Sequence, residues 1–225
     1  GLTRAFFWRK WYNAMNGGDI ETAKKVYDEW YAFIWETLKK RHGNDYEEKY
    51  LRRFVGTVTS AAYKALHPKE TNAPVNHVIA VLPDEWKTAT SNVVAALGIK
   101  GNPWDVAHDD SGWKTIKTFT DTRNAQGLPE YFGEMWYRVN FKAPKSSENL
   151  LMHFWKADRK VTLFINGRKV NEEEKEAFNG ATIDVTGHLK PGEDNQITVL
   201  VRHIPVPELF LGGLVDPVCL IEKGK

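Results

Sequence analysis

The sequence predicts an α+β protein of two parts, in which an N-terminal helical bundle or hairpin precedes an antiparallel β-sandwich. In the first third of the 225 residues, apolar side chains recur at helical spacing between capping residues and glycines. From residue 133 onward, short segments alternate apolar and polar side chains and are separated by turn-forming dipeptides. We therefore expect three helices in residues 1–67, a polar linker in 68–76 and the sandwich in 77–225.

The N-terminal helices are delimited by capping and helix-stopping residues. Gly17-Gly18 ends the first helix, Asp19 caps the second, and Pro68 ends the third. Their expected ranges are 3–16, 20–42 and, from Asn44 or Asp45, up to residue 67. Three short helices build only a small core, so we expect their many aromatic side chains to pack in the bundle and against the sandwich. The alternative is that some of them pack against a neighbouring domain that this chain lacks.

The strands of the sandwich are predicted by period-two patterns that leave one face apolar. The inward sets are Met135, Tyr137, Val139 and Phe141, then Leu150, Met152 and Phe154, and finally Ile197, Val199 and Val201. Asn166-Gly167 follows a further apolar strand, and this dipeptide tolerates the positive φ angles of a tight hairpin. Residues 77–86 predict an opening strand, and residues 87–113 and 120–132 predict long loops. Long loops on a rigid sheet are a common location of binding residues.

Four segments of the sandwich carry a resemblance to a known domain. They are Trp136-Tyr137-Arg138 with Phe141 and Pro144, the hairpin Phe164-Ile165-Asn166-Gly167, Ile183-Asp184-Val185-Thr186 before Leu189, and Gly212-Gly213-Leu214 with Pro217-Val218 before Leu220. In order and spacing they resemble the N-terminal jelly-roll domain of glycoside hydrolase family 2, and more broadly the galactose-binding-like fold of many carbohydrate-binding modules. The resemblance spans residues 78–222. It departs from the family at residues 155–158, where a Gly-rich turn is usual.

The resemblance implies a non-catalytic, carbohydrate-binding part of a polysaccharide-degrading hydrolase. Its partners would be a poly- or oligosaccharide and a catalytic domain of the same parent polypeptide, and its location would be secreted or periplasmic. Such sandwiches often hold a structural calcium ion, for which Asp84, Asp216 and Glu222 are the candidate carboxylates. No other cofactor is expected.

Sugar binding needs an aromatic platform and hydrogen-bonding side chains, and the outward strand positions and long loops supply both. The candidate ligand-binding residues are Trp104, Trp136, Arg138, His153, Trp155, Arg202, His203, Glu208 and Phe210. The last three belong to the 203–211 loop, which in the related hydrolases reaches toward the active site of the adjoining barrel. Ordinary packing is the alternative for each tryptophan. Trp113 resembles a tryptophan that packs under the sandwich in such domains, and we expect it to be structural.

Composition and motifs exclude several classes of function. The net charge of +2 and the lack of a long basic block argue against nucleic-acid binding. No apolar run is long enough to span a membrane, and the first residues lack the layout of a signal peptide. The single cysteine, Cys219, excludes an internal disulfide and is expected to be a buried, inert thiol. The chain opens on Gly1 in place of Met, which indicates either a residue added in cloning or a piece excised from a longer polypeptide.

No catalytic residue is assigned, and no metal site is predicted from histidine spacing. Asp109 and Asp110 are adjacent in sequence and diverge in direction, whereas glycoside hydrolysis needs two carboxyl groups that flank one bond. Three hypotheses remain: a carbohydrate-binding accessory region, a structural or protein-binding sandwich that supports a catalytic domain absent from this chain, and a small complete glycoside hydrolase. Exposed aromatic side chains would favour the first, and aromatic side chains buried between helices and sandwich would favour the second.

Overall fold

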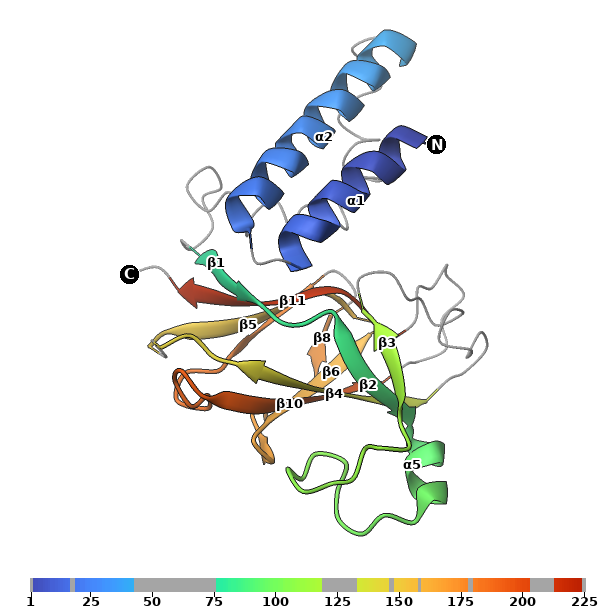
Figure 1. Ribbon diagram of the computed structural model, residues 1–225, viewed down its shortest axis with the longest axis vertical. Coiled ribbons are helices and arrows are strands. Elements are labelled where there is room, and N and C mark those ends of the chain that lie inside the picture. Colours follow the sequence, from blue (N-terminus) through green and yellow to red (C-terminus); the bar gives the residue numbers. More distant parts are fainter. Residues whose placement is uncertain are drawn as a thin grey trace.

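Two antiparallel β-sheets packed face to face form the main body of this computed structural model (Figure 1). The structure describes residues 2–16, 19–42, 76–118, 133–145, 148–157, 159–177, 180–202 and 213–223. One sheet has four strands in the order β1-β11-β5-β9, and the other has seven, in the order β3-β2-β4-β10-β6-β7 with β8 also paired to β6. The strands are β1 Asn76–Val81, β2 Glu85–Thr90, β3 Lys114–Lys117, β4 Glu134–Lys142, β5 Leu150–Ala157, β6 Lys160–Ile165, β7 Arg168–Lys169, β8 Lys175–Glu176, β9 Ala181–Asp184, β10 Asp194–Arg202 and β11 Leu214–Lys223.

The core between the sheets is built from the side chains that the period-two patterns place inward. All ten inward residues predicted for β4, β5 and β10 belong to one buried cluster, together with residues of β6 and β11. The predicted sandwich is therefore confirmed for the part of the chain that the structure describes. Asn166 and Gly167 have φ angles of 52° and 80°, and they form the predicted tight turn between β6 and β7.

The segment predicted as one opening strand is divided between the two sheets. β1 pairs with β11 in the four-stranded sheet, whereas β2 pairs with β3 and β4 in the seven-stranded sheet. The chain crosses between the sheets at residues 82–84, where Pro83 has no backbone N–H to donate to a continuous ladder. Periodicity alone does not reveal this crossing, because the apolar residues on both sides of it enter the same core.

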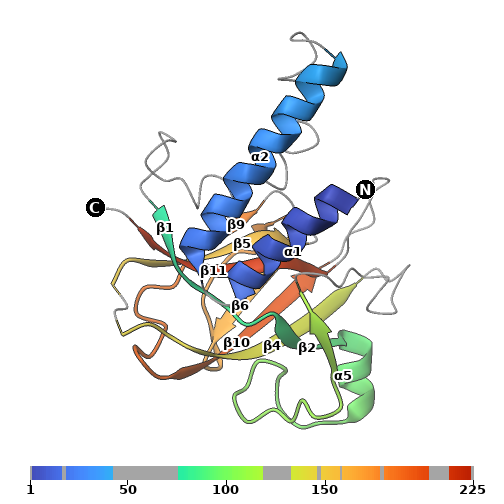
Figure 2. The same ribbon diagram turned by 45° about the horizontal axis from the view of Figure 1, so that its top comes forward.

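Two helices precede the sandwich, α1 (Leu2–Asn16) and α2 (Ile20–His42), and Asp19 caps the second by accepting a 3.0 Å hydrogen bond from Thr22 N. They lie side by side, and their lower ends meet the outer face of the four-stranded sheet (Figures 1 and 2). Trp11, Met15 and Tyr27 share a buried cluster there with Trp155, Cys219 and Ile221. The third predicted helix and nearly all of the predicted linker lie outside the described residues, so a three-helix bundle is not shown. None of the described helices has a stretch long and apolar enough to cross a bilayer.

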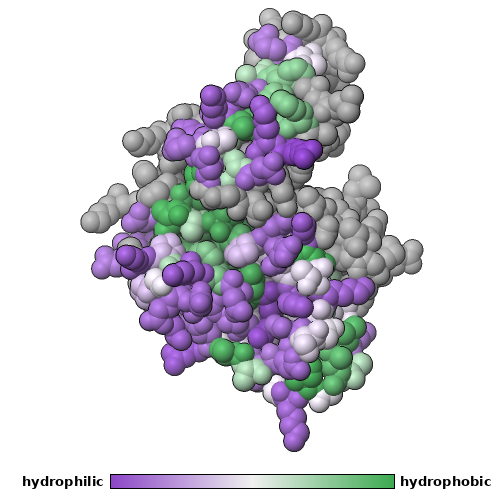
Figure 3. Space-filling model, in the orientation of Figure 1, coloured by the Kyte–Doolittle hydropathy of each residue, from purple (hydrophilic) through white to green (hydrophobic). Residues whose placement is uncertain are grey.

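The outer face of the seven-stranded sheet is also covered, by α5 (Ser91–Leu97) and the loop that follows it. This short helix lies in a region that the sequence predicts as irregular. It forms because the Thr90 side chain accepts from Val93 N at 3.2 Å and Gly98 ends the helix with a φ of 63°. Trp113 is buried beneath the loop, as predicted. Figure 3 shows hydrophobic side chains gathered over α5, at the lower right of a mainly hydrophilic surface.

Candidate functional site

The outward aromatic residues of the seven-stranded sheet form a packed cluster beneath the 99–113 loop. Trp104 stacks on Phe164 with ring centroids 4.8 Å apart and an interplanar angle of 9°, and its ring centroid lies 5.6 Å from that of Trp136. Trp136 is 5% exposed, and its Nε1 donates a 2.9 Å hydrogen bond to Ser91 Oγ. Two predicted platform residues are therefore brought together, but Trp136 is covered by protein and Phe164 occupies one face of Trp104.

Arg138 lies beside this cluster and binds the loop. The residue is only 4% exposed. Its Nε donates to Asp110 Oδ2 at 2.9 Å, and its Nη1 donates to the carbonyl oxygens of Pro103 and Asp105 at 2.5 and 3.0 Å. A charged group in this position anchors an otherwise irregular segment through several charge-assisted hydrogen bonds. From this geometry, Arg138 anchors the loop to the sheet, and Asp110 is its ionic partner in that contact.

His153 and Trp155 lie on the opposite side of the molecule, beneath the helices. Trp155 is 2% exposed, and its ring centroid lies 5.3 Å from that of Trp11. His153 Nδ1 shares a 2.9 Å hydrogen bond with Thr182 Oγ1, and burial lowers the pKa of this histidine to about 4. Its neighbour across the strands, Cys219, is fully buried, and burial raises the pKa of its thiol, as expected of an inert cysteine.

Arg202 remains partly exposed at the end of β10, but its side chain already has acidic partners. Its Nη2 lies 2.8 Å from Glu134 Oε1, and its Nη1 lies 2.9 Å from Glu174 Oε1. The remaining predicted ligand residues, His203, Glu208 and Phe210, lie outside the described residues. The described candidates are thus divided between the two outer faces and do not form one site.

The carboxylates expected to bind calcium do not fit one ion. Glu222 pairs with His77 near the start of β1, whereas Asp84 lies beyond the other end of that strand. At a rise of about 3.3 Å per residue, the part of β1 from His77 to Val81 alone spans about 13 Å, and Asp84 lies a further three residues along the chain. Calcium ligands lie within about 2.6 Å of the ion, so these two carboxylates cannot share it. The side chain of Asp216 lies outside the described part, within which no cluster of three or more His, Cys, Asp or Glu side chains is arranged to hold a metal.

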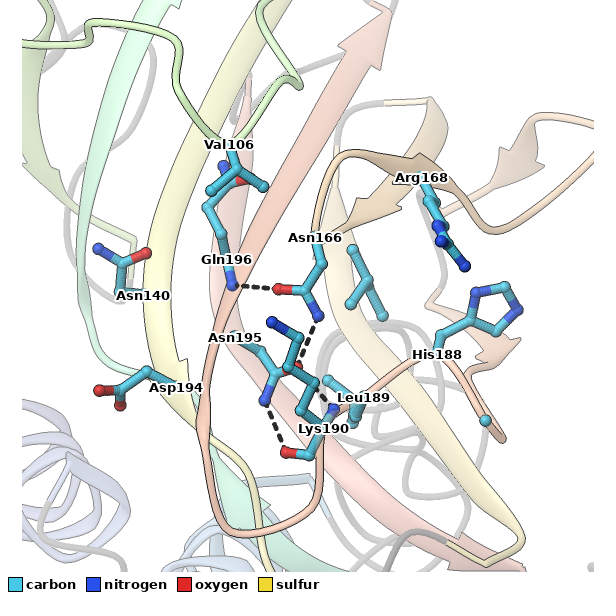
Figure 4. Close-up of a pocket in the computed structure, with 12 residues that line it drawn as sticks. Val106, Asn140, Asn166, Arg168, His188, Leu189, Lys190, Asp194, Asn195 and Gln196 are labelled. Carbon is cyan, nitrogen blue, oxygen red and sulfur yellow. Dashed lines mark hydrogen bonds between the residues drawn. The ribbon is translucent and has the colours of Figure 1, made fainter.

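A pocket of about 540 Å³ opens where the outer face of the seven-stranded sheet continues past the covering loop (Figure 4). It lies between the Asn166-Gly167 turn, the 187–190 turn and the first residues of β10. Its polar lining consists of Asn140, Asn166, Arg168, His188, Lys190, Asp194, Asn195 and Gln196. The lining residues come from five separate segments, namely the covering loop, β4, the β6–β7 hairpin, the 187–190 turn and β10, which explains why no local motif predicts the pocket.

Two amide side chains, those of buried Asn195 and half-buried Asn166, hold the walls of the pocket together. Asn195 Oδ1 accepts hydrogen bonds from Asn166 Nδ2 and from the backbone N of Lys190, both at 2.8 Å. Asn195 Nδ2 donates to the carbonyl oxygen of Lys190 at 3.0 Å, and Asn166 Oδ1 accepts from Gln196 N at 3.0 Å. These bonds tie the two turns to β10, so the backbone of the pocket is preorganised.

Five side chains in the pocket make no hydrogen bond or ion pair with any other described residue: Asn140, Arg168, His188, Lys190 and Asp194. Figure 4 shows Arg168 and His188 on one side of the pocket and Asn140 and Asp194 on the other. This arrangement offers donors and acceptors from opposite sides on a rigid sheet, which is the chemistry of a small polar ligand site. The sequence contains one signal for it, because Asn140 occupies the outward position that follows Trp136 and Arg138 on β4.

Comparisons with known proteins relate the chain to parts of glycoside hydrolases. No family model matches the chain. Over 122 residues it is 30% identical to a β-glucuronidase of Formosa agariphila, across 47% of this chain and 12% of that protein. The solved β-glucuronidase of Ruminococcus gnavus in complex with D-glucaro-d-lactam matches with a TM-score of 0.50 at 18% identity, over 68% of this chain and 30% of that one. A Bacteroides uniformis β-glucuronidase matches with a TM-score of 0.48 at 25% identity, over 65% and 17%.

The likeness to the Ruminococcus gnavus structure shows the fold of the sandwich. The sequence similarity to the Formosa agariphila protein supports a region related to glycoside hydrolases. This chain spans 12% of the length of that relative and 30% or less of the two solved proteins.

Proposed function

We propose that this chain is a non-catalytic, carbohydrate-binding accessory region of a polysaccharide-degrading glycoside hydrolase. In this proposal the sandwich is a galactose-binding-like jelly roll of the kind that begins family 2 enzymes. Its partners are a poly- or oligosaccharide and a catalytic domain of the same polypeptide, in a secreted or periplasmic protein. The similarity to β-glucuronidases supports the class of ligand, because those proteins are named for action on a glycoside.

The observation that carries the proposal is the pocket with five side chains that have no described partner. Protein-bound sugars are held by planar amides and charged groups that bond their hydroxyls, on a scaffold that does not need to rearrange. Asn140 and Asp194 supply these groups from paired strands, since β4 and β10 are hydrogen-bonded along their length. None of the described residues that line this pocket is Trp, Tyr or Phe, so we expect hydrogen bonding to dominate over aromatic stacking there.

Binding without cleavage follows from the carboxyl groups of the pocket. Glycoside hydrolysis requires two carboxyl groups, which stand about 5–10 Å apart on either side of the scissile bond. Within the described part of the chain, Asp194 is the one carboxylate that lines the pocket. The pocket therefore lacks the pair that an acid–base or nucleophilic mechanism uses.

The burial of Trp155 against Trp11 favours a second candidate function. Aromatic side chains buried between helices and sheet contribute packing and cannot stack on a sugar, as we expect if the sandwich supports a neighbouring domain and binds no sugar itself. The two candidates make opposite predictions for the pocket, since a support domain does not need Asn140 or Asp194.

Affinity electrophoresis of the purified chain against a panel of plant and algal polysaccharides tests the proposal, with a parallel assay for new reducing ends. We expect retardation in at least one polysaccharide and no release of reducing ends. Asn140→Ala and Asp194→Ala should each abolish most of the retardation. Lys142→Ala is the matched control, because Lys142 is exposed on the same strand as Asn140 and does not line the pocket. Retardation that survives both pocket substitutions, or no retardation at all, would favour the support function.

A further inference from the structure

The pocket carries an excess of positively charged and N–H-donating side chains. Arg168, His188 and Lys190 lie in its lining, whereas Asp194 is the one carboxylate among the lining residues that the structure describes. The whole chain is close to electrical balance, with a net charge of +2. The local excess therefore belongs to the pocket and does not reflect a generally basic protein surface.

These basic side chains have no acidic partner in the described structure. The other solvent-facing arginine described above, Arg202, is neutralised by two glutamates. Arg168 makes no ion pair with a described carboxylate, and Figure 4 shows its guanidinium directed toward the imidazole of His188. Two hydrogen-bond donors that point toward one another without an acceptor between them form a site that favours an anion.

The backbone fixes the positions of these donors. Arg168 belongs to the tight β6–β7 hairpin, where it pairs with Ile165. His188 N donates to Val185 O at 3.0 Å, and Lys190 is tied to Asn195 through both its N–H and its carbonyl oxygen. Only the side chains of these residues are free to adapt to a ligand, which lowers the entropy cost of binding.

We propose that the pocket binds an acidic saccharide, and that Arg168, His188 and Lys190 hold its anionic group. This inference rests on the proposed carbohydrate-binding function and names the class of sugar. The planar guanidinium of Arg168 matches the two oxygens of a carboxylate, as in a uronate unit, and it also accommodates a sulfate ester. Asn140 and Asp194, on the far side of the pocket, then receive the hydroxyl groups of the same sugar or of its neighbour.

Isothermal titration calorimetry with three matched ligands tests the proposal on the full chain. The ligands are uronate oligosaccharides containing glucuronate or galacturonate, the same oligosaccharides with their carboxyl groups reduced, and sulfated neutral oligosaccharides. We expect the uronate or the sulfated ligand to bind at least about 10-fold more tightly than the reduced one, because a hydrogen bond to a charged group contributes that much. The preferred acid identifies which anionic group the pocket accepts. Raising the salt concentration should weaken this binding.

Arg168→Gln should weaken binding of the acidic ligand by about 10-fold to 100-fold and leave binding of the reduced ligand unchanged. Lys175→Gln is the charge-matched control, because Lys175 is exposed on β8 and does not line the pocket. If Arg168→Gln alters the melting temperature, Lys190→Gln provides a second pocket variant, because the Lys190 side chain is exposed.

Equal affinity for the acidic and the reduced ligands would overturn the acidic-saccharide inference and leave the carbohydrate-binding function intact. The same conclusion would follow if Arg168→Gln and Lys175→Gln weakened binding of the acidic ligand equally. If none of the three ligands binds and no polysaccharide retards the chain, both the inference and the proposed function are wrong.

Discussion

Replacement of Trp155 by alanine tests whether this tryptophan is a packing residue between the helices and the sandwich. The side chain lies on β5 and points away from the sandwich core toward α1. If its role is packing, Trp155→Ala should destabilise the protein and leave polysaccharide retardation of the folded protein unchanged. If it were a sugar platform, the substitution would abolish retardation and barely affect stability.

The expected loss of stability follows from the burial of the ring. An aromatic side chain buries about 150–250 Å², which at about 25 cal/mol/Å² corresponds to roughly 4–6 kcal/mol. The alanine methyl group keeps part of that burial, and measured Trp-to-Ala substitutions in cores cost about 3–5 kcal/mol. Trp155 Nε1 is buried and has no hydrogen-bond partner among the described residues, so removing the indole also removes an unsatisfied donor. We therefore expect a decrease in the free energy of unfolding near the lower end, about 3 kcal/mol.

Urea denaturation followed by tryptophan fluorescence and by far-ultraviolet circular dichroism measures this loss. Trp155→Phe is the matched variant, because phenylalanine keeps a ring against Trp11 without the unsatisfied N–H. It should cost less than Trp155→Ala, because phenylalanine leaves a smaller cavity. Limited proteolysis of Trp155→Ala should release α1 and α2 faster than in the parent chain, since Trp155 is a central contact between them and the sheet.

A loss below about 1 kcal/mol for Trp155→Ala would refute the packing argument, because a buried aromatic side chain of this size cannot be removed at so small a cost. Loss of polysaccharide retardation at unchanged stability would restore Trp155 as a sugar platform.

Three further predictions concern single residues and are tested by urea denaturation of each variant. Burial lowers the pKa of His153 to about 4 in the folded protein, so the unfolded chain binds a proton more readily. The free energy of unfolding should therefore fall by about 3 kcal/mol as the pH drops from 6.5 to 4. His153→Gln should remove most of this pH dependence. A pH slope that persists in the variant would contradict this. Arg138→Ala should lower the free energy of unfolding by about 3 kcal/mol, because it leaves the loop carbonyls without their donor. Arg202→Ala removes an exposed ion pair and should cost under about 1 kcal/mol. Equal losses in the two variants would contradict the anchoring role of Arg138. Asn195→Leu should lower the free energy of unfolding by about 2–4 kcal/mol and abolish ligand binding, because it leaves the backbone N–H of Lys190 unsatisfied. Binding that survives this substitution would show that the pocket does not depend on the Asn195 amide.

The inward faces of the strands were predictable because a sandwich core imposes a period of two on every strand. Met135, Tyr137 and Val139 lie in the core as that pattern requires. The tight turn at Asn166-Gly167 was equally predictable, because few dipeptides tolerate its positive φ angles.

The outward faces were harder to interpret, because a period-two pattern does not say what covers the second face. Trp136 and Arg138 alternate correctly with the core residues, yet both are buried beneath a loop that comes from residues 99–113. Trp155 likewise occupies an outward position on β5, and it is buried against α1. Each of these contacts joins segments far apart in the sequence.

By itself, the sequence determined the sandwich, its inward residues, its tight turns and the first two helices, since these depend on local spacing and on the conformational preferences of single residues. Only the tertiary structure decided which outward side chains are covered and which remain free. It buried Trp136 and Trp155, left Trp104 half-buried, and gathered Asn140, Arg168, His188, Lys190 and Asp194 around one pocket. The physical reason is that a ligand site on a sandwich is formed by residues from separate strands and turns, and their proximity arises from strand pairing between distant segments.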